Sequence, residues 1–248
     1  MPEDSRPPVL LELENVQKQY ESPGEPIHAV RGASVTVRER ERLALLGPSG
    51  CGKTTLLLLI AGHLRADGGS VRYAGRDLAE LSKRETLAHR REQLGFVFQS
   101  FDLTTGMSAR ENVAVPLLLR HVPHSQAEER AGEALAEVGL ASRGAHLIER
   151  LSGGEQQRVA IARAIVGEPR LLLADEATGN LDSETGAEIL ALLAELPARH
   201  GAAVILVTHN KDATAHTDRV LQMRDGRLTE PERETGSKGG PDHSPVRR

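Results

Sequence analysis

Cysteine and aromatic residues are scarce in this 248-residue sequence, which contains one cysteine, no tryptophan and 2% aromatic residues. The single cysteine, Cys51, excludes an intramolecular disulfide and a cysteine-based metal cluster, and it suits a reducing compartment such as the cytosol. Because aromatic side chains are few, Leu, Val, Ile and Ala must do most of the packing. We therefore expect an aliphatic core.

Excess positive charge is missing as well, since the formal net charge is −4. Proteins that bind nucleic acid or anionic lipid surfaces use clustered Lys and Arg side chains to displace counterions or to approach the surface. The charge balance therefore predicts no nucleic-acid partner.

Long apolar runs and a targeting segment are also missing. No stretch approaches the roughly 18 apolar residues that are needed to cross a bilayer. The N-terminal sequence MPEDSRPPVLLELENV lacks the basic and apolar regions of a signal peptide. A role at a membrane would thus require another chain to supply the span. Polar composition predicts disorder for residues 1–8 and 229–248, which leaves 9–228 as the folded domain.

Three continuous aliphatic runs, at residues 42–47, 170–175 and 202–209, are typical of strands that are buried on both faces of a parallel sheet. Ligands of open parallel sheets bind beyond the carboxyl ends of the strands. The residues that end these runs are therefore predicted to meet at one edge of the sheet: Gly47 and those after it, Asp175 with Glu176, and His209.

Two additions to this core are predicted. Residues 9–20 and 31–40 alternate apolar and polar side chains, which favours antiparallel strands, and an Asp-Gly pair within 219–228 indicates a hairpin. Capping boxes open two helical patterns, at Ser108 and at Ser125. We interpret residues from about 87 to 165 as a mostly helical subdomain inserted into an α/β fold.

Residues 47–54, GPSGCGKT, match G-x-x-x-x-G-K-[ST] between a predicted strand and a predicted helix. The glycines leave backbone N–H groups free to face phosphate oxygens, the helix presents its positive end, and Lys53 adds charge for the outer phosphates. The hydroxyl of Thr54 is a ligand of the kind that Mg²⁺ prefers. A glycine-rich turn before an ordinary helix is the alternative.

The run LLLADE ends in two carboxylates, Asp175 and Glu176. This placement directs one carboxylate toward a metal ion and the other toward an attacking water. Two acids at a strand end also occur in solvated turns, and His209 alone is equally typical of a surface or core histidine. The strand-end arrangement instead predicts that His209 lies near the terminal phosphate.

A second glycine pair follows Ser152 in the sequence LSGGE. Ser152 and Glu155 form a capping box that opens a helix, which Glu168-Pro169 terminates. Each glycine weakens a helix by about 0.8–1 kcal/mol relative to alanine. This loss is easier to explain if a phosphate approaches the backbone closely at the helix N-terminus than if the helix is only structural. A flexible joint is the alternative interpretation.

The sequence LSGGE, followed by QQRVAIARAI, resembles the signature sequence of the ATP-binding cassette (ABC) ATPases. The similarity extends over nearly all of residues 9–228. GFVFQ, LLLADE, ATGNLD and His209 occur in the order found in that family. The motifs GFVFQSF, ENVAVPL and TGNLD are similar to the branch of macrolide-export, lipoprotein-release and cell-division ATPases (MacB, LolD and FtsE types).

The resemblance implies the ABC ATPase fold: a P-loop NTPase core with a mostly parallel sheet, an antiparallel β subdomain and an inserted α-helical subdomain. It implies a hydrolytic site in which Lys53 contacts the β- and γ-phosphates, Glu176 is the general base and His209 holds the γ-phosphate. Thr54, Gln99 and Asp175 are the implied ligands of Mg²⁺, so the implied catalytic set is Glu176, His209, Lys53 and Gln99.

Nucleotide contacts are also implied by the resemblance. Tyr20 would stack on adenine, Ser152 and the two glycines after it would bind the nucleotide of a partner subunit, and Asp182 would couple the two sites. The implied ATP-binding residues are Tyr20, Gly47, Pro48, Ser49, Gly50, Cys51, Gly52, Lys53, Thr54, Thr55, Ser152, Gly153, Gly154 and Asp182.

Three positions depart from the family pattern. The family usually has Pro at the position of Ala177, an acidic residue at the position of Asn210, and a different loop sequence in place of residues 102–109. None of these departures removes a catalytic group, although the loop bears on docking to a permease.

The implied partners are a second ATPase subunit, as a homodimer or a related pair, and an integral-membrane permease supplied by another chain. The leading hypothesis is a peripheral subunit on the cytoplasmic side of the cell membrane that hydrolyses ATP to power export or extraction. One alternative is an FtsE-like ATPase that signals through a membrane partner in cell division. A soluble ABC ATPase associated with nucleic acid is disfavoured by the single cassette, the single cysteine and the lack of a basic patch.

Overall fold

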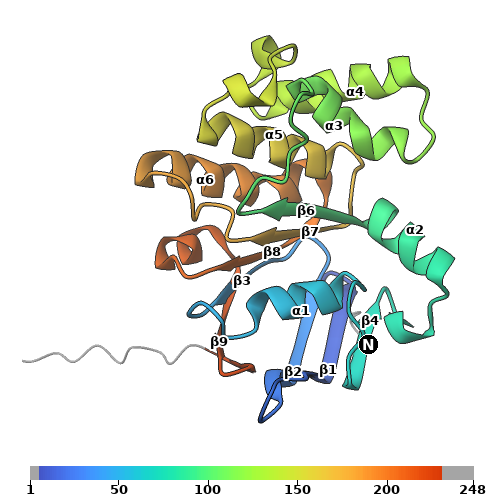
Figure 1. The fold of residues 1–248 in the computed structure, drawn as a ribbon, viewed down its shortest axis with the longest axis vertical. Helices are drawn as coiled ribbons and strands as arrows, with labels where there is room; N and C mark the ends of the chain where they lie inside the picture. The colour runs from blue at the N-terminus through green and yellow to red at the C-terminus, as the bar shows by residue number, and fades with distance from the viewer. Residues whose placement is uncertain (1–5, 231–248) are drawn as a thin grey trace, which may run out of the picture.

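The computed structural model describes residues 6–230, so most of the two segments predicted to be disordered, 1–8 and 229–248, lies outside the described residues. The strands form a six-stranded sheet in the order β10-β9-β3-β8-β7-β6 and a four-stranded sheet in the order β2-β1-β4-β5 (Figure 1). The strands are β1 (Val9–Tyr20), β2 (Ile27–Arg38), β3 (Arg42–Leu46), β4 (Gly68–Tyr73), β5 (Arg76–Asp77), β6 (Leu94–Phe98), β7 (Leu171–Asp175), β8 (Ala203–Thr208), β9 (Arg219–Arg224) and β10 (Arg227–Thr229). The α-helices are α1 (Lys53–Ile60), α2 (Lys83–Gln93), α3 (Ala109–Leu118), α4 (His124–Glu137), α5 (Gly153–Ile165) and α6 (Ser183–His200).

The three aliphatic runs form β3, β7 and β8, which are parallel neighbours as predicted. Their side chains alternate between two cores because successive residues of a strand point to opposite faces. Leu173 and Ile205 face a core shared with α1 and the four-stranded sheet, whereas Leu172 and Leu206 face a core shared with α3 to α6. The sheet is thus covered on both faces, which explains why its strands are continuously apolar.

The two predicted β additions are confirmed. β1 pairs with β2 in an antiparallel ladder, and β2 begins at Ile27, four residues before the predicted start at 31. The hairpin of β9 and β10 turns at Asp225 and Gly226, whose φ values are 47° and 77°. Positive φ at both central residues is what a two-residue hairpin turn of type I′ requires, and it accounts for the Asp-Gly pair.

Helices α5 and α6 cover one face of the six-stranded sheet, and α3 and α4 pack on α5 on the side away from the sheet (Figure 1). The capping box at Ser108 is confirmed, with Glu111 N donating to Ser108 Oγ at 3.2 Å. The capping box predicted at Ser125 is wrong, because α4 begins at His124 with Pro123 as its N-cap. Proline suits a helix start because its φ is fixed, so it places Ser125 inside the first turn. The subdomain boundaries, about 87 and 165, stay a prediction.

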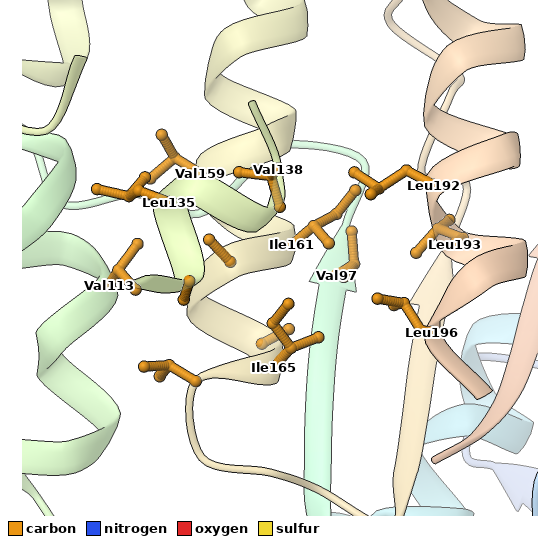
Figure 2. Close-up of a cluster of buried hydrophobic side chains, with 14 of the residues drawn as sticks. Val97, Val113, Leu135, Val138, Val159, Ile161, Ile165, Leu192, Leu193 and Leu196 are labelled. Atoms are coloured by element: carbon orange, nitrogen blue, oxygen red, sulfur yellow. The ribbon is translucent and has the colours of Figure 1, made fainter. Parts of the chain in front are cut away.

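Strand β6 is not evident from the sequence pattern. It lies between α2 and α3 in the sequence and pairs in parallel with β7, so it joins the six-stranded sheet at its edge. Its sequence, LGFVF, is short and follows a charged helical stretch, which hides the strand pattern. Figure 2 shows Val97 of this strand between Ile161 of α5 and Leu193 of α6. The strand therefore forms part of the floor on which the helical layer packs.

Close packing of α5 against β6 depends on Gly95. A Cβ atom at this position would lie 2.5 Å from Ala164 O and 2.8 Å from Leu172 Cδ1. We expect Gly95→Ala to lower the free energy of unfolding by about 1–3 kcal/mol, because backbone atoms cannot move aside as a side chain can.

Gly132 supplies the matched control. It lies within α4, and a Cβ atom at this position would have its nearest neighbour 3.9 Å away. Gly132→Ala is expected to raise the free energy of unfolding by about 0.5–1 kcal/mol, since alanine favours the helix. Urea denaturation followed by circular dichroism measures both changes, and equal midpoints for the two variants would contradict the close approach of α5 to β6.

Candidate functional site

The phosphate-binding sequence forms the turn between β3 and α1, where it was predicted. Gly52, the N-cap of α1, has φ 106° and ψ 4°, a left-handed conformation that favours glycine. Side chains are excluded here for a second reason: a Cβ at Gly52 would overlap Ala29 O, and one at Gly47 would overlap Met223 O. The neighbouring backbone thus fixes a bare loop that opens onto a helix N-terminus.

Lys53 is the first residue of α1, and only 6% of its side chain is exposed. Its Nζ donates hydrogen bonds to Gly47 O and Pro48 O, both at 2.8 Å, and lies 3.6 Å from Glu176 Oε1. The ammonium group therefore lies over the loop, with a carboxylate as its counterion. A buried cation in this position is directed at whatever anion the loop binds.

Asp175 and Glu176 extend from the end of β7 to this loop. Thr54 Oγ1 donates to Asp175 Oδ2 at 2.8 Å, and His209 Nδ1 lies 2.7 Å from Glu176 Oε2. The predicted meeting of the three strand ends is therefore confirmed. Glu176 itself has φ 49°, an uncommon conformation for a residue that is not glycine. Such strain is found at functional sites, where the surrounding structure holds it.

The second oxygen of Asp175, Oδ1, is buried and has no hydrogen-bond partner among the described residues. Burial raises the pKa of Asp175; the hydrogen bond from Thr54 opposes this effect, and the charge of Glu176 adds to it. An unpartnered carboxylate oxygen next to a threonine hydroxyl is a hard-oxygen set of the kind that Mg²⁺ prefers. These residues therefore fit the predicted metal ion.

Beside the loop lies a cavity of about 560 Å³, whose lining includes Tyr20 together with Lys53, Thr54 and Thr55. Tyr20 is 38% exposed, and Lys18 Nζ lies 5.9 Å from the centroid of its ring. An exposed aromatic ring offers a stacking surface for a planar group. The structure thus brings Tyr20 to the phosphate loop from β1, even though the two lie far apart in the chain.

Gln99 follows β6 directly, and its side chain donates to Asn180 Oδ1 at 3.1 Å. Asn180 in turn donates through Nδ2 to Gln99 O at 2.9 Å. The sequence pattern predicts no role for Asn180, because nothing local marks its contact with a residue 81 positions away. The motif ATGNLD is the available signal.

Ser152 opens α5 with the predicted capping box, in which Ser152 N donates to Glu155 Oε2 at 2.9 Å and Glu155 N donates to Ser152 Oγ at 3.3 Å. The hydrogen bond from the Ser152 backbone lowers the pKa of Glu155. Ser152 and Gly153 are exposed. Within residues 6–230, no hydrogen bond or ion pair joins 152–154 to the loop at 47–54, so these two predicted anion sites are separate in one chain.

Asp182 is the N-cap of α6. Its Oδ1 accepts from Glu184 N at 3.1 Å and from Thr185 N at 3.0 Å, and its Oδ2 accepts from Thr185 Oγ1 at 2.7 Å. These hydrogen bonds lower the pKa of Asp182, and the one from the Thr185 backbone has the largest effect. Asp182, which is predicted to couple two subunits, thus caps the helix that follows the loop at 177–182.

A bare loop between a strand and a helix, with a buried lysine and a strand-end carboxylate pair, defines a P-loop nucleoside triphosphatase. Residues 30–179 match the family model described as ABC transporter. The chain belongs to the ABC transporter ATPase family, and it is an ATPase that binds ATP.

Relatives support this assignment. The lipoprotein-releasing system ATP-binding protein LolD of Chromohalobacter salexigens is 45% identical over 90% of this chain and 94% of its own length. The macrolide export ATP-binding/permease protein MacB of Rhodospirillum rubrum is 42% identical over 90% of this chain, which spans only 34% of that protein. The predicted resemblance to the LolD and MacB branch is therefore confirmed.

Solved structures give the same fold. A bacterial ABC transporter cassette solved as a dimer is similar, with TM-score 0.82 and 35% identity, over 89% of this chain and 98% of its own. The same cassette in a dimeric post-hydrolysis state, bound to ADP and Pi, gives TM-score 0.81 over the same shares. The predicted ABC ATPase fold is thus confirmed. Within the described part of the chain, no helix is long and apolar enough to cross a membrane.

The raised pKa of Asp175 predicts a gain in stability when its charge is removed. A carboxyl whose pKa is raised by burial destabilises the fold when it is ionised, and this effect is full above the folded pKa. Asp175→Asn keeps an acceptor for Thr54 and should raise the free energy of unfolding of the nucleotide-free protein by about 0.5–2 kcal/mol at pH 8.

The pH dependence provides the control for this prediction. Below about pH 4 the aspartate is protonated in the unfolded chain as well, so the two proteins should there unfold at the same urea concentration. Urea titrations at a series of pH values measure the difference. A gain that does not change with pH would show that it has another cause than the buried charge.

Proposed function

We propose that the chain is the ATP-hydrolysing subunit that powers export or extraction by a separate membrane permease. The named relatives are ATP-binding proteins of a lipoprotein-releasing system and of macrolide export. The chain matches nearly the whole of the first but only about a third of the second, whose name includes a permease. This pattern supports a subunit that works with a permease on another chain, rather than a cell-division signalling or nucleic-acid role.

The observation that carries the mechanism is the convergence of Lys53, Asp175, Glu176 and His209 at one edge of the sheet. In the proposed mechanism Lys53 exchanges its carbonyl partners for the outer phosphates of ATP. Glu176 accepts a proton from the attacking water, and His209 contacts the terminal phosphate and holds it in place. Thr54, Asp175 and Gln99 are the proposed ligands of Mg²⁺. When bound, the ion neutralises charge that develops on the phosphate oxygens.

Two copies are needed to complete a site in this proposal. The loop at 47–54 and the helix tip at 152–154 are separate within one chain, yet each presents backbone N–H groups at a helix N-terminus. An ATP molecule held between them would join two subunits, and its binding free energy would become closure of the dimer. The single cysteine, Cys51, is free and suits the reducing cytosol, which supports a peripheral position on the cytoplasmic side of the membrane.

The base assignment makes a direct prediction. Glu176→Gln should bind ATP and accumulate as a dimer while its turnover falls by about 100-fold or more, because a carboxamide cannot accept the proton of the attacking water. Phosphate release and size-exclusion chromatography with Mg²⁺ and ATP measure both properties. Glu195→Gln, an exposed glutamate of α6, is the control and should keep the wild-type rate. Wild-type turnover in Glu176→Gln would remove Glu176 from the mechanism.

Complementation tests whether each site contains parts of two chains. Lys53→Ala should destroy the loop half of its own site, and Ser152→Arg should block the helix-tip half that it offers to a partner. Each variant alone is expected to be inactive. A mixture should regain turnover, because a mixed dimer contains one site with a native loop and a native helix tip. If the mixture stays inactive although the two variants form a mixed dimer with Mg²⁺ and ATP, the shared site is wrong.

A groove on the outer side of β6 is the proposed docking site for the permease. A cavity of about 550 Å³ there is lined by the apolar side chains of Leu87, Phe96, Phe98 and Leu119 and also by arginines. Leu119 is 62% exposed and Leu87 is 58% exposed. Exposed apolar residues grouped around a groove mark an interaction surface, and an amphipathic helix of the permease suits its shape. Phe98 immediately precedes Gln99, so an occupant would contact the edge of the hydrolytic site.

Leu119→Glu tests this surface. The substitution places a charge among apolar groups and should reduce recovery of the subunit with its permease from membranes by about tenfold, while ATP binding by the isolated subunit stays unchanged. Val9→Glu, which alters an exposed apolar residue of the four-stranded sheet, is the matched control. Full recovery of the Leu119 variant with the permease would place the docking site elsewhere.

A further inference from the structure

The link between Gln99 and Asn180 has a defined polarity. Asn180 Nδ2 donates to the backbone oxygen of Gln99 at 2.9 Å, and Asn180 Oδ1 accepts from Gln99 Nε2 at 3.1 Å. A backbone carbonyl only accepts, so the amide nitrogen of Asn180 must face it. Its oxygen is then directed at the end of the Gln99 side chain, which must present its nitrogen in return.

This arrangement engages the nitrogen of the Gln99 carboxamide, whereas its Oε1 has no hydrogen bond to any residue within 6–230. A carboxamide has one end that donates and one that accepts, and only the oxygen is a ligand for Mg²⁺. Without a partner that selects the nitrogen, both orientations of the amide would be populated. Asn180 removes this ambiguity by engaging the nitrogen.

The backbone of the loop at 177–182 is shaped for the same contact. A Cβ at Gly179 would lie 2.8 Å from Gln99 Nε2 and 3.3 Å from Glu176 O, so a larger residue would push the glutamine away. Gly179 N also donates to Glu176 O at 2.8 Å, which closes the turn directly after the proposed base. Two adjacent residues, Gly179 and Asn180, therefore both determine how closely Gln99 approaches this loop.

We propose that Asn180 is a positioning residue that sets which end of the Gln99 carboxamide faces the Mg²⁺ site. The inference rests on the proposed function, because it takes Gln99 as a metal ligand. Both side chains are exposed, so water competes for these hydrogen bonds and the link contributes little to overall stability. Its effect is on the orientation of one amide. The link between Gln99 and Asn180 also connects Gln99, which follows the groove residue Phe98, to the loop at 177–182.

The test compares the effect of removing the Asn180 side chain in two proteins, one with glutamine and one with glutamate at position 99. Only the glutamine has to be oriented. In Gln99→Glu both ends of the side chain are oxygen, so no partner has to select between them. All proteins carry Glu176→Gln to block hydrolysis, and Mn²⁺ binding to the protein–ATP complex is measured by electron paramagnetic resonance. Asn180→Ala should weaken Mn²⁺ binding about tenfold when residue 99 is glutamine and leave it unchanged when residue 99 is glutamate.

Two controls accompany this comparison. Asn15→Gly removes an asparagine side chain from the four-stranded sheet at a position with φ 48°, and it should leave Mn²⁺ binding at the wild-type level. Gln99→Ala measures the full contribution of the glutamine. Circular dichroism melting of each variant verifies that the fold is retained.

The outcomes separate the inference from the proposed function. If Asn180→Ala weakens Mn²⁺ binding equally in both backgrounds, or in neither, Asn180 does not orient the amide and the inference is wrong, while the role of Gln99 stands. If Gln99→Ala leaves Mn²⁺ binding unchanged, Gln99 is not a metal ligand. That result would overturn both its proposed role and the inference built on it.

Discussion

The parallel ladder that joins β7, β8 and β3 places the polar groups of the site. Leu46 pairs with Thr208, and Asp175 pairs with Val207, so the three strands end at the same level. The ladder continues one residue past the strands, where Glu176 N donates to Val207 O at 2.8 Å. This backbone hydrogen bond fixes the position of Glu176. Its carboxylate is thereby held within reach of Lys53 and His209.

The same edge of the sheet concentrates charge in a half-buried place. Lys53 is almost fully buried, Glu176 is largely buried, and Asp175 has an oxygen without a partner among the described residues. Lys53 has a carboxylate and two carbonyls as partners, so burial does not leave it unpaired. Asp175 is less well satisfied, and burial raises its pKa. Such a site trades stability of the empty protein for the ability to bind a metal ion and phosphates.

A chain of contacts runs from the apolar groove to the end of the site. Phe98 lines the groove, Gln99 follows it, Asn180 binds Gln99 twice, and Asp182 caps α6 two residues later. Arg163 of α5 joins this region, with its guanidinium donating to Phe101 O at 2.9 Å and to Asp102 O at 2.6 Å. Phe101 and Asp102 both have positive φ, so the segment after Gln99 is held in a strained conformation. A partner in the groove would therefore contact Phe98, which directly precedes Gln99, and Arg163 of α5, which is hydrogen-bonded to this segment.

Local sequence by itself determined the phosphate loop, the capping boxes at Ser108 and Ser152, the Asp-Gly hairpin and the buried parallel strands. Each depends on residues that are close in the chain, and the loop glycines and helix caps have few alternatives. Motif resemblance added the family and roles for residues such as Tyr20 and Gln99, which no local pattern marks. Only the tertiary structure decided that Pro123 rather than Ser125 opens α4, that residues 94–98 pair with β7, and that Asn180 orients toward Gln99. These features depend on competing caps, on sheet pairing and on contacts across 81 positions, and short-range propensity carries no information about such distances.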